Sequence, residues 1–550
     1  MTDQLDPYLL KAAAPGTIFE IGERDGLRQF VNAPMDLSAM IETARRHGER
    51  TFIVEGDRRV SYAQLFDWRD RMVPLLKIAK GDRVGICMRN RAEWIIAFLA
   101  VIRAGGVAVL FNSRGAPDEL AAMVAEATPA LVIADSERAA KLTEGGYAGR
   151  LIDLTGPEAA AAQAKDLPPA QDFPAIAPDD PCTILFTSGT TGRPKGAVLT
   201  HRSLITGLLS VQMSGLMILH KIADDYGISA EQLMQQLPQQ AVMLVFPLFH
   251  ISGLGSAFLS PLFSGHKIVM MRRWDAQEAM RLVEAEKVTM ISGVPTMMWD
   301  MLNSPAFPTA DLSSLTNIGI GGQATPVRLV EAINAGIPSA AIGTGYGMTE
   351  CSGSVAQSVG GDFVRKPASA GRVLPMVEMA IRGPDGQELP QGEAGEITVR
   401  GAMVMQGYWN RPEETAQILS PDGWLTTGDV GYIDEEGYVF IIDRKKDMVI
   451  SSGENIYCAE VERVITEMHG IHECATFGLP DERLGEKLVA VVRADGVSAN
   501  DIAAEVSAKL ASYKAPAEIA FTAEHMPRTA TGKVDKRALK ARWPELIGEK

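Results

Sequence analysis

The chain has 550 residues, with 53 lysines and arginines against 68 aspartates and glutamates, a formal net charge of −15. A chain of this length exceeds one hydrophobic core, so at least two domains are expected. The acidic balance argues against a nucleic-acid-binding protein, because phosphate backbones select for basic surfaces. It does not argue against a nucleotide ligand, for which a local group of donors is enough.

The first apolar segments give no sign of export or of a membrane span. The N-terminal MTDQLDPYLL has acidic residues where a signal peptide has basic ones. Residues 241–265 lack Asp, Glu, Lys and Arg, but prolines and glycines interrupt them. We expect a buried strand, a loop and a buried helix there, and no transmembrane segment. The five scattered cysteines have no zinc-ligand spacing, which is typical of reduced thiols and predicts a cytoplasmic protein.

Short apolar segments alternate with helical patterns through most of the chain. We expect strands at 83–88, 107–111, 130–135 and 266–271, and an apolar helix over 92–105. This βαβ order predicts an α/β fold with parallel sheets covered by helices.

Two helices carry clear signals of their own. Asp275 with Glu278 predicts a capping box, followed by an apolar face that includes Ala279 and Val283. Residues 461–468 repeat the helical spacing with Val461, Val464, Ile465 and Met468.

The composition changes after about residue 375. Short strand candidates separated by Gly, Pro and Asp turns occur at 378–390, 395–401 and 431–441, which predicts a β-rich subdomain. After DRKKD (443–447) the pattern returns to mixed α/β, which predicts a small C-terminal domain.

The strongest local motif is TSGTTGRPKG at residues 187–196, directly after the apolar TILF. Small hydroxyl residues and glycines let backbone amides approach an anion closely, and Lys195 adds positive charge. The spacing from Gly192 to Lys195 differs from a Walker A loop, and no Ser or Thr follows the lysine. The motif predicts a phosphate-binding loop, with a flexible surface loop as the alternative.

This loop resembles the signature of the adenylate-forming superfamily, which includes acyl-CoA synthetases, firefly luciferase and peptide-synthetase adenylation domains. The other motifs of that family follow in its order: YGMTE at 346–350, GAMVMQGYWNRPEET at 401–415, GWLTTGD at 423–429, DRKKD at 443–447, GENIY at 453–457 and PRTATGK at 527–533. The likeness runs from about residue 30 to about residue 540.

The resemblance implies an ATP-dependent acid–CoA ligase. Such an enzyme activates a carboxylic acid as an acyl-adenylate, releases pyrophosphate and passes the acyl group to coenzyme A, with Mg²⁺ as the metal. The implied architecture is a large N-terminal region (1–442), a hinge (443–447) centred on Lys446, and a mobile C-terminal domain (448–550). Alternatives are a stand-alone adenylation enzyme that loads a carrier protein and a nucleotide-binding paralogue without activity.

The resemblance also implies a role for each motif residue. Lys533 would contact the acid and the α-phosphate, where the reaction brings anion against anion. Glu350 and Thr349 would hold Mg²⁺, since hard oxygen ligands suit this ion. The β- and γ-phosphates would be held by Thr187, Ser188, Gly189, Thr190, Thr191, Gly192 and Lys195. From composition alone, Lys533 is a solvated surface lysine and the Thr349-Glu350 pair a helix cap.

The nucleoside and the acid have their own implied contacts. Asp429 would accept hydrogen bonds from the ribose hydroxyls, and Arg444 would reach the ribose or the phosphates. His250 would lie in the acid pocket, with a structural histidine as an equal alternative. The adenine pocket would comprise Tyr346 with Gly345, Gly347 and Met348 on one side and Gly321, Gly322 and Gln323 on the other. After rotation of the C-terminal domain, the CoA channel would be lined by Ser452, Gly453 and Glu454.

Two departures from the family pattern bear on the substrate. Ile450 stands where luciferase carries a second lysine, which argues against a luciferase-like oxygenase. The segment 213–240, expected to form one or two helices with a turn at Tyr226-Gly227, is longer than the typical linker. A surface insertion is the favoured interpretation. The alternatives are a cover over the acid pocket and a subunit contact, as in a homodimer.

The acid itself is predicted from the glycines around the proposed pocket. They leave room for a bulky apolar tail, and no cation in the sequence marks a second carboxylate. A medium- or long-chain fatty acid is the first expectation, and an aryl acid of the benzoate or cinnamate type is the second.

Overall fold

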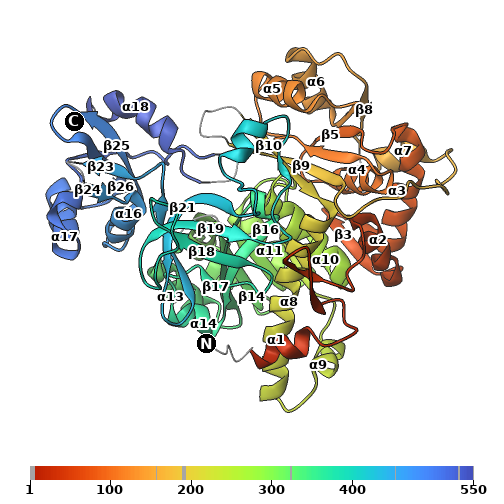
Figure 1. Cartoon of the computed structure of the whole chain (residues 1–550), viewed down its shortest axis with the longest axis horizontal. Coiled ribbons are helices and arrows are strands. Elements are labelled where there is room, and N and C mark those ends of the chain that lie inside the picture. The colour runs from red at the N-terminus through yellow and green to blue at the C-terminus, as the bar shows by residue number, and fades with distance from the viewer. Residues whose placement is uncertain are drawn as a thin grey trace.

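The computed structural model describes residues 6–156, 158–188, 194–321, 325–451, 454–529 and 533–548. Figure 1 shows helices packed around the sheets of the N-terminal region, with the end of the chain forming a smaller body at one side.

One sheet of the N-terminal region has a parallel centre and an antiparallel edge. The expected strands at 83–88, 107–111 and 130–135 pair in parallel within it, with Val84 opposite both Ala108 and Leu131. They are apolar throughout because helices cover both faces. The strand order is β20 (Gly407–Tyr408), β10 (Pro194–Thr200), β9 (Pro181–Ser188), β6 (Val107–Leu110), β5 (Arg83–Cys87), β7 (Leu131–Ala134) and β8 (Leu151–Asp153).

The other large sheet joins parallel and antiparallel strands in one hydrogen-bonded array. The strands expected as a β-rich subdomain continue this sheet, because β17 pairs with β16 on one side and with β22 on the other. The strand order is β18 (Glu378–Arg382), β19 (Gly395–Arg400), β21 (Leu425–Ile433), β22 (Tyr438–Arg444), β17 (Gly371–Val373), β16 (Gly353–Val359), β15 (Ala341–Met348), β14 (Asn317–Gly321), β13 (Met290–Gly293), β11 (Ala241–Leu244), β12 (Lys267–Met270), β3 (Thr51–Glu55) and β4 (Arg58–Ser61).

The C-terminal part has its own sheet and its own core. The strand order is β24 (Glu454–Ile456), β23 (Val449–Ser451), β26 (Gly485–Ala494) and β25 (Ile471–Asp481), with β27 (Glu518–Phe521) beside β26. The helix α16 (Cys458–Thr466) buries Val461, Val464 and Ile465 as its spacing predicts. Met468 lies past the end of this helix and packs against the same core.

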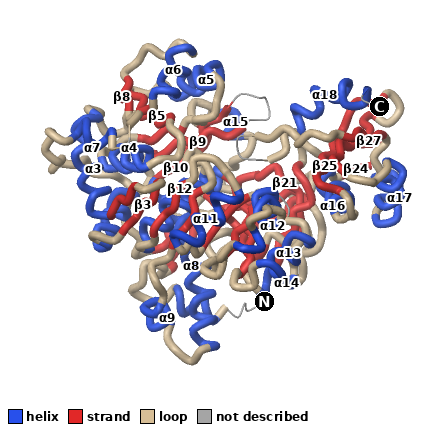
Figure 2. Tube along the Cα trace, turned by 180° about the vertical axis from the view of Figure 1, so that it is seen from behind, coloured by secondary structure: helices blue, strands red, loops and turns tan. Residues whose placement is uncertain are grey.

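The helices cover both faces of the sheets (Figures 1 and 2). A short hairpin of β1 (Ile21–Arg24) and β2 (Leu27–Phe30) lies between the first two helices in the chain. The remaining helical segments are α1 (Pro7–Ala12), α2 (Leu37–Glu42), η1 (Thr43–His47), α3 (Tyr62–Leu76), α4 (Ala92–Arg103), α5 (Pro117–Ala127), α6 (Ser136–Glu144), α7 (Ala159–Ala164), α8 (His201–Asp225), α9 (Ala230–Gln236), η2 (Ser252–Leu259), α10 (Ser260–Ser264), α11 (Ala276–Glu286), α12 (Pro295–Leu302), η3 (Phe307–Thr309), α13 (Val327–Gly336), η4 (Thr349–Cys351), α14 (Gly361–Arg365), α15 (Pro412–Ala416), α17 (Ala499–Lys509), η5 (Ser512–Lys514) and α18 (Lys536–Gly548).

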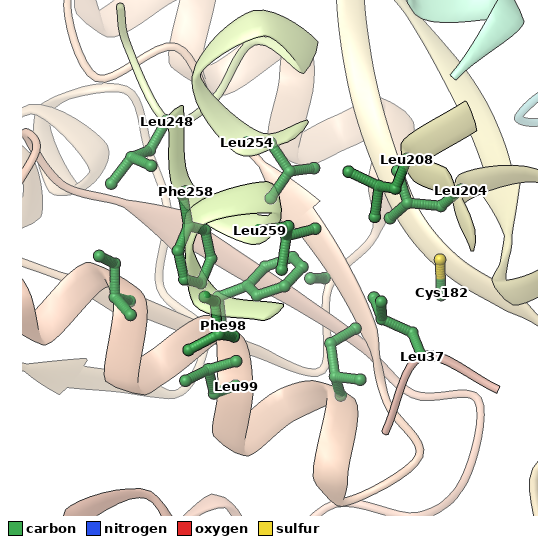
Figure 3. Close-up of a cluster of buried hydrophobic side chains, with 14 of the residues drawn as sticks. Leu37, Phe98, Leu99, Cys182, Leu204, Leu208, Leu248, Leu254, Phe258 and Leu259 are labelled. Atoms are coloured by element: carbon green, nitrogen blue, oxygen red, sulfur yellow. The ribbon is translucent and has the colours of Figure 1, made fainter. Parts of the chain in front are cut away.

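The largest core lies where α4, the π-helix η2 and α8 meet. Trp94 stacks on Phe98, and both rings meet Phe258 edge-on at centroid distances of 6.3 and 5.8 Å. Figure 3 shows Phe98, Phe258 and the leucines of these elements packed together. The expected burial of residues 241–265 is confirmed, since they form β11, η2 and α10 with mostly buried side chains.

The segment 213–240 forms helices with a turn, as predicted. It comprises the end of α8 and α9, and the chain turns at Tyr226 and Gly227, where Gly227 has φ 67°. The two helices project from one end of the molecule beside α1 (Figures 1 and 2), where Lys11 Nζ lies 2.6 Å from Asp224 Oδ2. Among the described helices, α8 is long and apolar enough to cross a membrane, but half of its most apolar window is buried in the fold.

One local prediction is only half right. Asp275 caps α11 by accepting a hydrogen bond from the Glu278 backbone N–H at 2.8 Å. The reciprocal bond of a capping box is replaced, because the Glu278 carboxylate accepts from the Arg281 guanidinium at 2.6 and 2.7 Å.

Candidate active site

A cavity of about 2890 Å³ lies between the N-terminal sheets and the C-terminal domain. It brings together charged residues that are far apart in the sequence: Lys195, Glu350, Arg444, Lys446 and Lys533 all line it. Its volume exceeds the roughly 300–1,000 Å³ of a site for one small ligand. It therefore has room for more than one substrate.

Lys533 reaches this cavity from the C-terminal domain. Its carbonyl accepts a hydrogen bond from the Thr529 N–H at 2.8 Å, which closes the loop just before α18. Burial lowers the pKa of Lys533, and the positive charges of Arg444 and Lys446 lower it further, against the opposing effect of Asp429. Cations held close together despite their repulsion are what a polyphosphate site requires.

Asp429 and Arg444 face each other across adjacent strands. Asp429 lies in β21 opposite Arg444 in β22, and the Arg444 Nε lies 3.1 Å from Asp429 Oδ1. The other oxygen of this buried carboxylate accepts a hydrogen bond from the Tyr346 hydroxyl at 2.7 Å. Both oxygens already have a partner, so the ribose contacts predicted for Asp429 would use its remaining lone pairs.

Glu350 is a buried carboxylate at the edge of the cavity, in the short helix η4 directly after β15. Its Oε1 accepts a hydrogen bond from the Tyr408 hydroxyl at 2.7 Å. Thr349 also lines the cavity. Within the described ranges, no cluster of three or more His, Cys, Asp or Glu could hold a metal. One carboxylate beside a phosphate site nevertheless fits Mg²⁺, which keeps several waters and binds through phosphate oxygens.

Lys195 is the second residue of β10, the strand that follows the predicted phosphate loop. Thr187 lies opposite it in β9, and both residues line the cavity. Lys195 forms an ion pair with Glu414. Gly189, Thr190, Thr191 and Gly192 lie outside the described residues, as does the side chain of Ser188.

His250 lines the cavity and is partly buried. Its Nε2 is buried and has no hydrogen-bond partner among the described residues. Burial lowers the pKa of His250 to about 4, and the nearby charges of Arg114 and Lys533 act in the same direction. The imidazole is therefore neutral at pH 7, in a cavity wall that also contains Lys533.

The predicted adenine pocket is partly described. Gly321, Gly345, Gly347 and Met348 line the cavity, whereas Gly322 and Gln323 lie outside the described residues. A Cβ on Gly347 would lie 2.0 Å from the Gly353 carbonyl oxygen, so no other residue fits there.

The predicted CoA-channel residues are not brought to this cavity where they are described. Glu454 lies in β24 of the C-terminal sheet and is exposed, paired with Ser451 of β23. Ser452 and Gly453 lie outside the described residues.

The comparisons decide the family. The model of the AMP-binding enzymes matches residues 40–409, and that of their C-terminal domain matches residues 460–533. The chain belongs to the AMP-binding enzyme family. The predicted fold and enzyme class are confirmed: it is an AMP-forming acid–CoA ligase that uses ATP, Mg²⁺ and coenzyme A.

Similar proteins within this family differ in their acids. The chain is 35% identical over 510 residues to the feruloyl-CoA synthase of Amycolatopsis sp, covering 92% of this chain and 98% of that one. It is 34% identical over 502 residues to the long-chain-fatty-acid–CoA ligase FadD13 of Mycobacterium tuberculosis, covering 89% and 94%. The crystal structure of ATP-bound MatB from Rhodopseudomonas palustris superposes with a TM-score of 0.79 at 28% identity, covering 92% and 99%.

Sequence reasoning missed three features of this ligase. It assigned no role to the side chains of residues 401–415, although Tyr408 and Glu414 contact Glu350 and Lys195. It did not single out Arg114, which lines the cavity near His250. It favoured a surface insertion for residues 213–240 over a cover of the acid pocket; most of residues 221–240 are exposed, but residues of α8 and α9 also line the cavity.

Proposed function

We propose that this ligase activates a large apolar acid, first of all a medium- or long-chain fatty acid, whose tail lies along α8. The observation that carries the proposal is the composition of the cavity wall. The arm of the cavity along α8 and α9 is lined by apolar side chains: Val211, Leu216, Ile218, Leu219, Ile222, Met234 and Leu237.

Residues of other segments complete the wall and mix apolar with polar side chains, among them Thr43, Ser264 and His266. The wall also includes Ile18, Phe19 and Phe263, and the nearby Arg46 donates to the Phe263 carbonyl oxygen at 3.3 Å. A tail that removes this surface from water gains about 0.8 kcal/mol for each buried methylene. A long alkyl chain therefore buries more methylenes in this arm, and binds more tightly, than a short acid does.

The chemistry that we assign to the site runs in two steps. In the first, the carboxylate attacks the α-phosphorus of ATP and the bond to pyrophosphate breaks, with Lys533 stabilising the charge that develops at the α-phosphate. Lys195 would neutralise the departing pyrophosphate, and Glu350 with Thr349 would hold Mg²⁺, which screens the phosphate charge when bound.

In the second step, the CoA thiol attacks the acyl carbonyl, loses its proton, and AMP leaves. Lys533 occupies the cavity in the present arrangement. We therefore propose that the C-terminal domain, residues 448–550, rotates about Lys446 in the turn after β22, with residues 1–442 as the fixed body. This rotation would bring Ser452, Gly453 and Glu454 to the CoA channel.

An aryl acid is the second candidate. It is favoured by the similarity to a feruloyl-CoA synthase. A compact aromatic acid would leave the α8–α9 arm of the cavity unfilled, which is why we place it second.

A panel of acids tests the proposal. CoA-dependent release of AMP would be measured with hexanoate, dodecanoate, hexadecanoate, benzoate and cinnamate at equal ATP. We expect kcat/KM to rise with chain length to dodecanoate or beyond. A preference for benzoate or cinnamate would show that the acid is an aryl acid and not a fatty acid. Adenylate formation with no CoA-dependent release of AMP would favour a carrier-loading enzyme.

The same proposal includes a cytoplasmic enzyme. It is supported by the cysteines, all of which are free and four of which are buried. A homodimer remains a prediction, which light scattering on the purified enzyme would test.

A further inference from the structure

The segment 405–416 joins the two parts of the site that face the phosphates. Its strand β20 pairs with β10, the strand that begins at Pro194 and Lys195. The Trp409 N–H donates to the Gly196 carbonyl at 2.8 Å, and the Met405 N–H donates to the Glu350 carbonyl at 2.8 Å. One short segment is therefore bonded to the backbone next to Lys195 and to that of Glu350.

The side chains of this segment also contact both Glu350 and Lys195. The Tyr408 hydroxyl donates to Glu350 Oε1 at 2.7 Å, and the Lys195 ammonium lies over the Tyr408 ring, 5.3 Å from its centroid. The same ammonium forms an ion pair with Glu414 in α15. Lys195 and Glu414 are 15% and 24% exposed, so solvent screens their interaction only partly.

Glu414 is in turn held by a second pair. The Arg411 Nη1 donates to Glu414 Oε1 at 2.9 Å. The Arg411 Nε and Nη2 each donate at 2.8 Å to one oxygen of Glu126 at the end of α5. This bidentate contact fixes the plane of the guanidinium. Glu126, Arg411, Glu414 and Lys195 thus form a chain of ion pairs, each residue bonded to the next.

We infer that Glu414, held by Arg411, is a positioning residue that orients the Lys195 ammonium toward the pyrophosphate leaving group. A lysine ammonium has three N–H donors on a flexible stem, and an ion pair with one carboxylate restricts where the other two point. Orientation matters because a misplaced charge stabilises the departing pyrophosphate poorly. The inference rests on the proposed contact of Lys195 with the β- and γ-phosphates.

This role predicts an effect on one half-reaction only. Adenylation releases pyrophosphate, whereas thioester formation from preformed acyl-adenylate does not. Glu414→Ala should therefore slow adenylation on the order of ten- to a hundred-fold and leave thioester formation unchanged. Merely structural damage would slow both.

A double-mutant cycle provides the test. ATP–pyrophosphate exchange and acyl-CoA formation from synthetic acyl-adenylate would be measured for Lys195→Ala, Glu414→Ala and the double variant. The control is Glu413→Ala, since Glu413 is the exposed neighbour in α15 and forms no ion pair within the described residues. Glu414→Gln, which keeps an acceptor and the side-chain size, serves if the alanine variant folds poorly.

We expect the double variant to match Lys195→Ala, because Glu414 acts through the lysine. Independent, multiplying losses would overturn the inference, as would a normal Glu414→Ala enzyme or equal loss of both half-reactions. Normal exchange by Lys195→Ala would instead refute the phosphate contact proposed for Lys195, and the positioning role with it.

Discussion

Filling the cavity beside Gly215 should shorten the acids that the enzyme accepts. Gly215 lies in α8, lines the cavity, and a Cβ built on it meets no heavy atom within 4 Å. A Gly215→Leu side chain would enter this space with four carbon atoms. If it displaces about four methylenes of the tail, at about 0.8 kcal/mol each, the loss is about 3 kcal/mol, or on the order of a hundred-fold in kcat/KM.

The assay compares chain lengths within each variant. We expect kcat/KM for hexadecanoate to fall on the order of a hundred-fold in Gly215→Leu, while hexanoate is unaffected and Gly215→Ala lies close to the parent. Loss of the fold is not the expected cause, because replacing a mid-helix glycine by leucine favours the helix by roughly 0.8 kcal/mol. An unchanged ratio of hexadecanoate to hexanoate would refute the placement of the tail along α8.

Three further predictions concern the metal, the hinge and a buried carboxyl. Glu350→Gln should lower activity and raise the Mg²⁺ concentration for half-maximal rate, whereas an unchanged titration would leave Glu350 without a metal role. Lys446→Pro should keep much of the ATP–pyrophosphate exchange and lose most thioester formation, because proline fixes φ near −65° at the hinge, and survival of both half-reactions would exclude this hinge. Burial raises the pKa of Asp443 from 3.8 to about 6, so ionising this carboxyl in the folded chain costs up to roughly 3 kcal/mol. The free energy of unfolding of the parent therefore falls by up to this amount as the pH rises from about 4 to about 6. The Asp443→Asn variant should therefore gain in melting temperature relative to the parent between pH 4 and pH 7, and a constant difference would contradict the raised pKa.

The sequence predicted best what depends on neighbouring residues. The buried parallel strands β5, β6 and β7 could be recognised from their apolar residues alone, because both of their faces are covered. The continuity of the large sheet could not, since it depends on the three residues of β17, Gly371–Val373, pairing both with the nearby β16 and with β22, which is distant in the sequence.

The site shows the same division. The family motifs placed Lys533, Glu350 and Lys195, and the structure brings all three to one cavity. Glu414, the ion-pair partner of Lys195, lies in a motif more than two hundred residues later, and nothing in the sequence around either residue indicates that they pair. The wall formed by α8 could not be predicted either, because a helical pattern shows which residues are apolar but not what they face.

The part played by Lys533 is the centre of this account, and its two half-reactions can be measured separately. For Lys533→Ala, we predict that ATP–pyrophosphate exchange falls on the order of a hundred- to a thousand-fold, because one charge at the α-phosphate is lost from the transition state. The same preparation, supplied with synthetic acyl-adenylate and CoA, should form acyl-CoA at nearly the parent rate. Normal exchange by this variant, or equal loss of both half-reactions, would contradict the account.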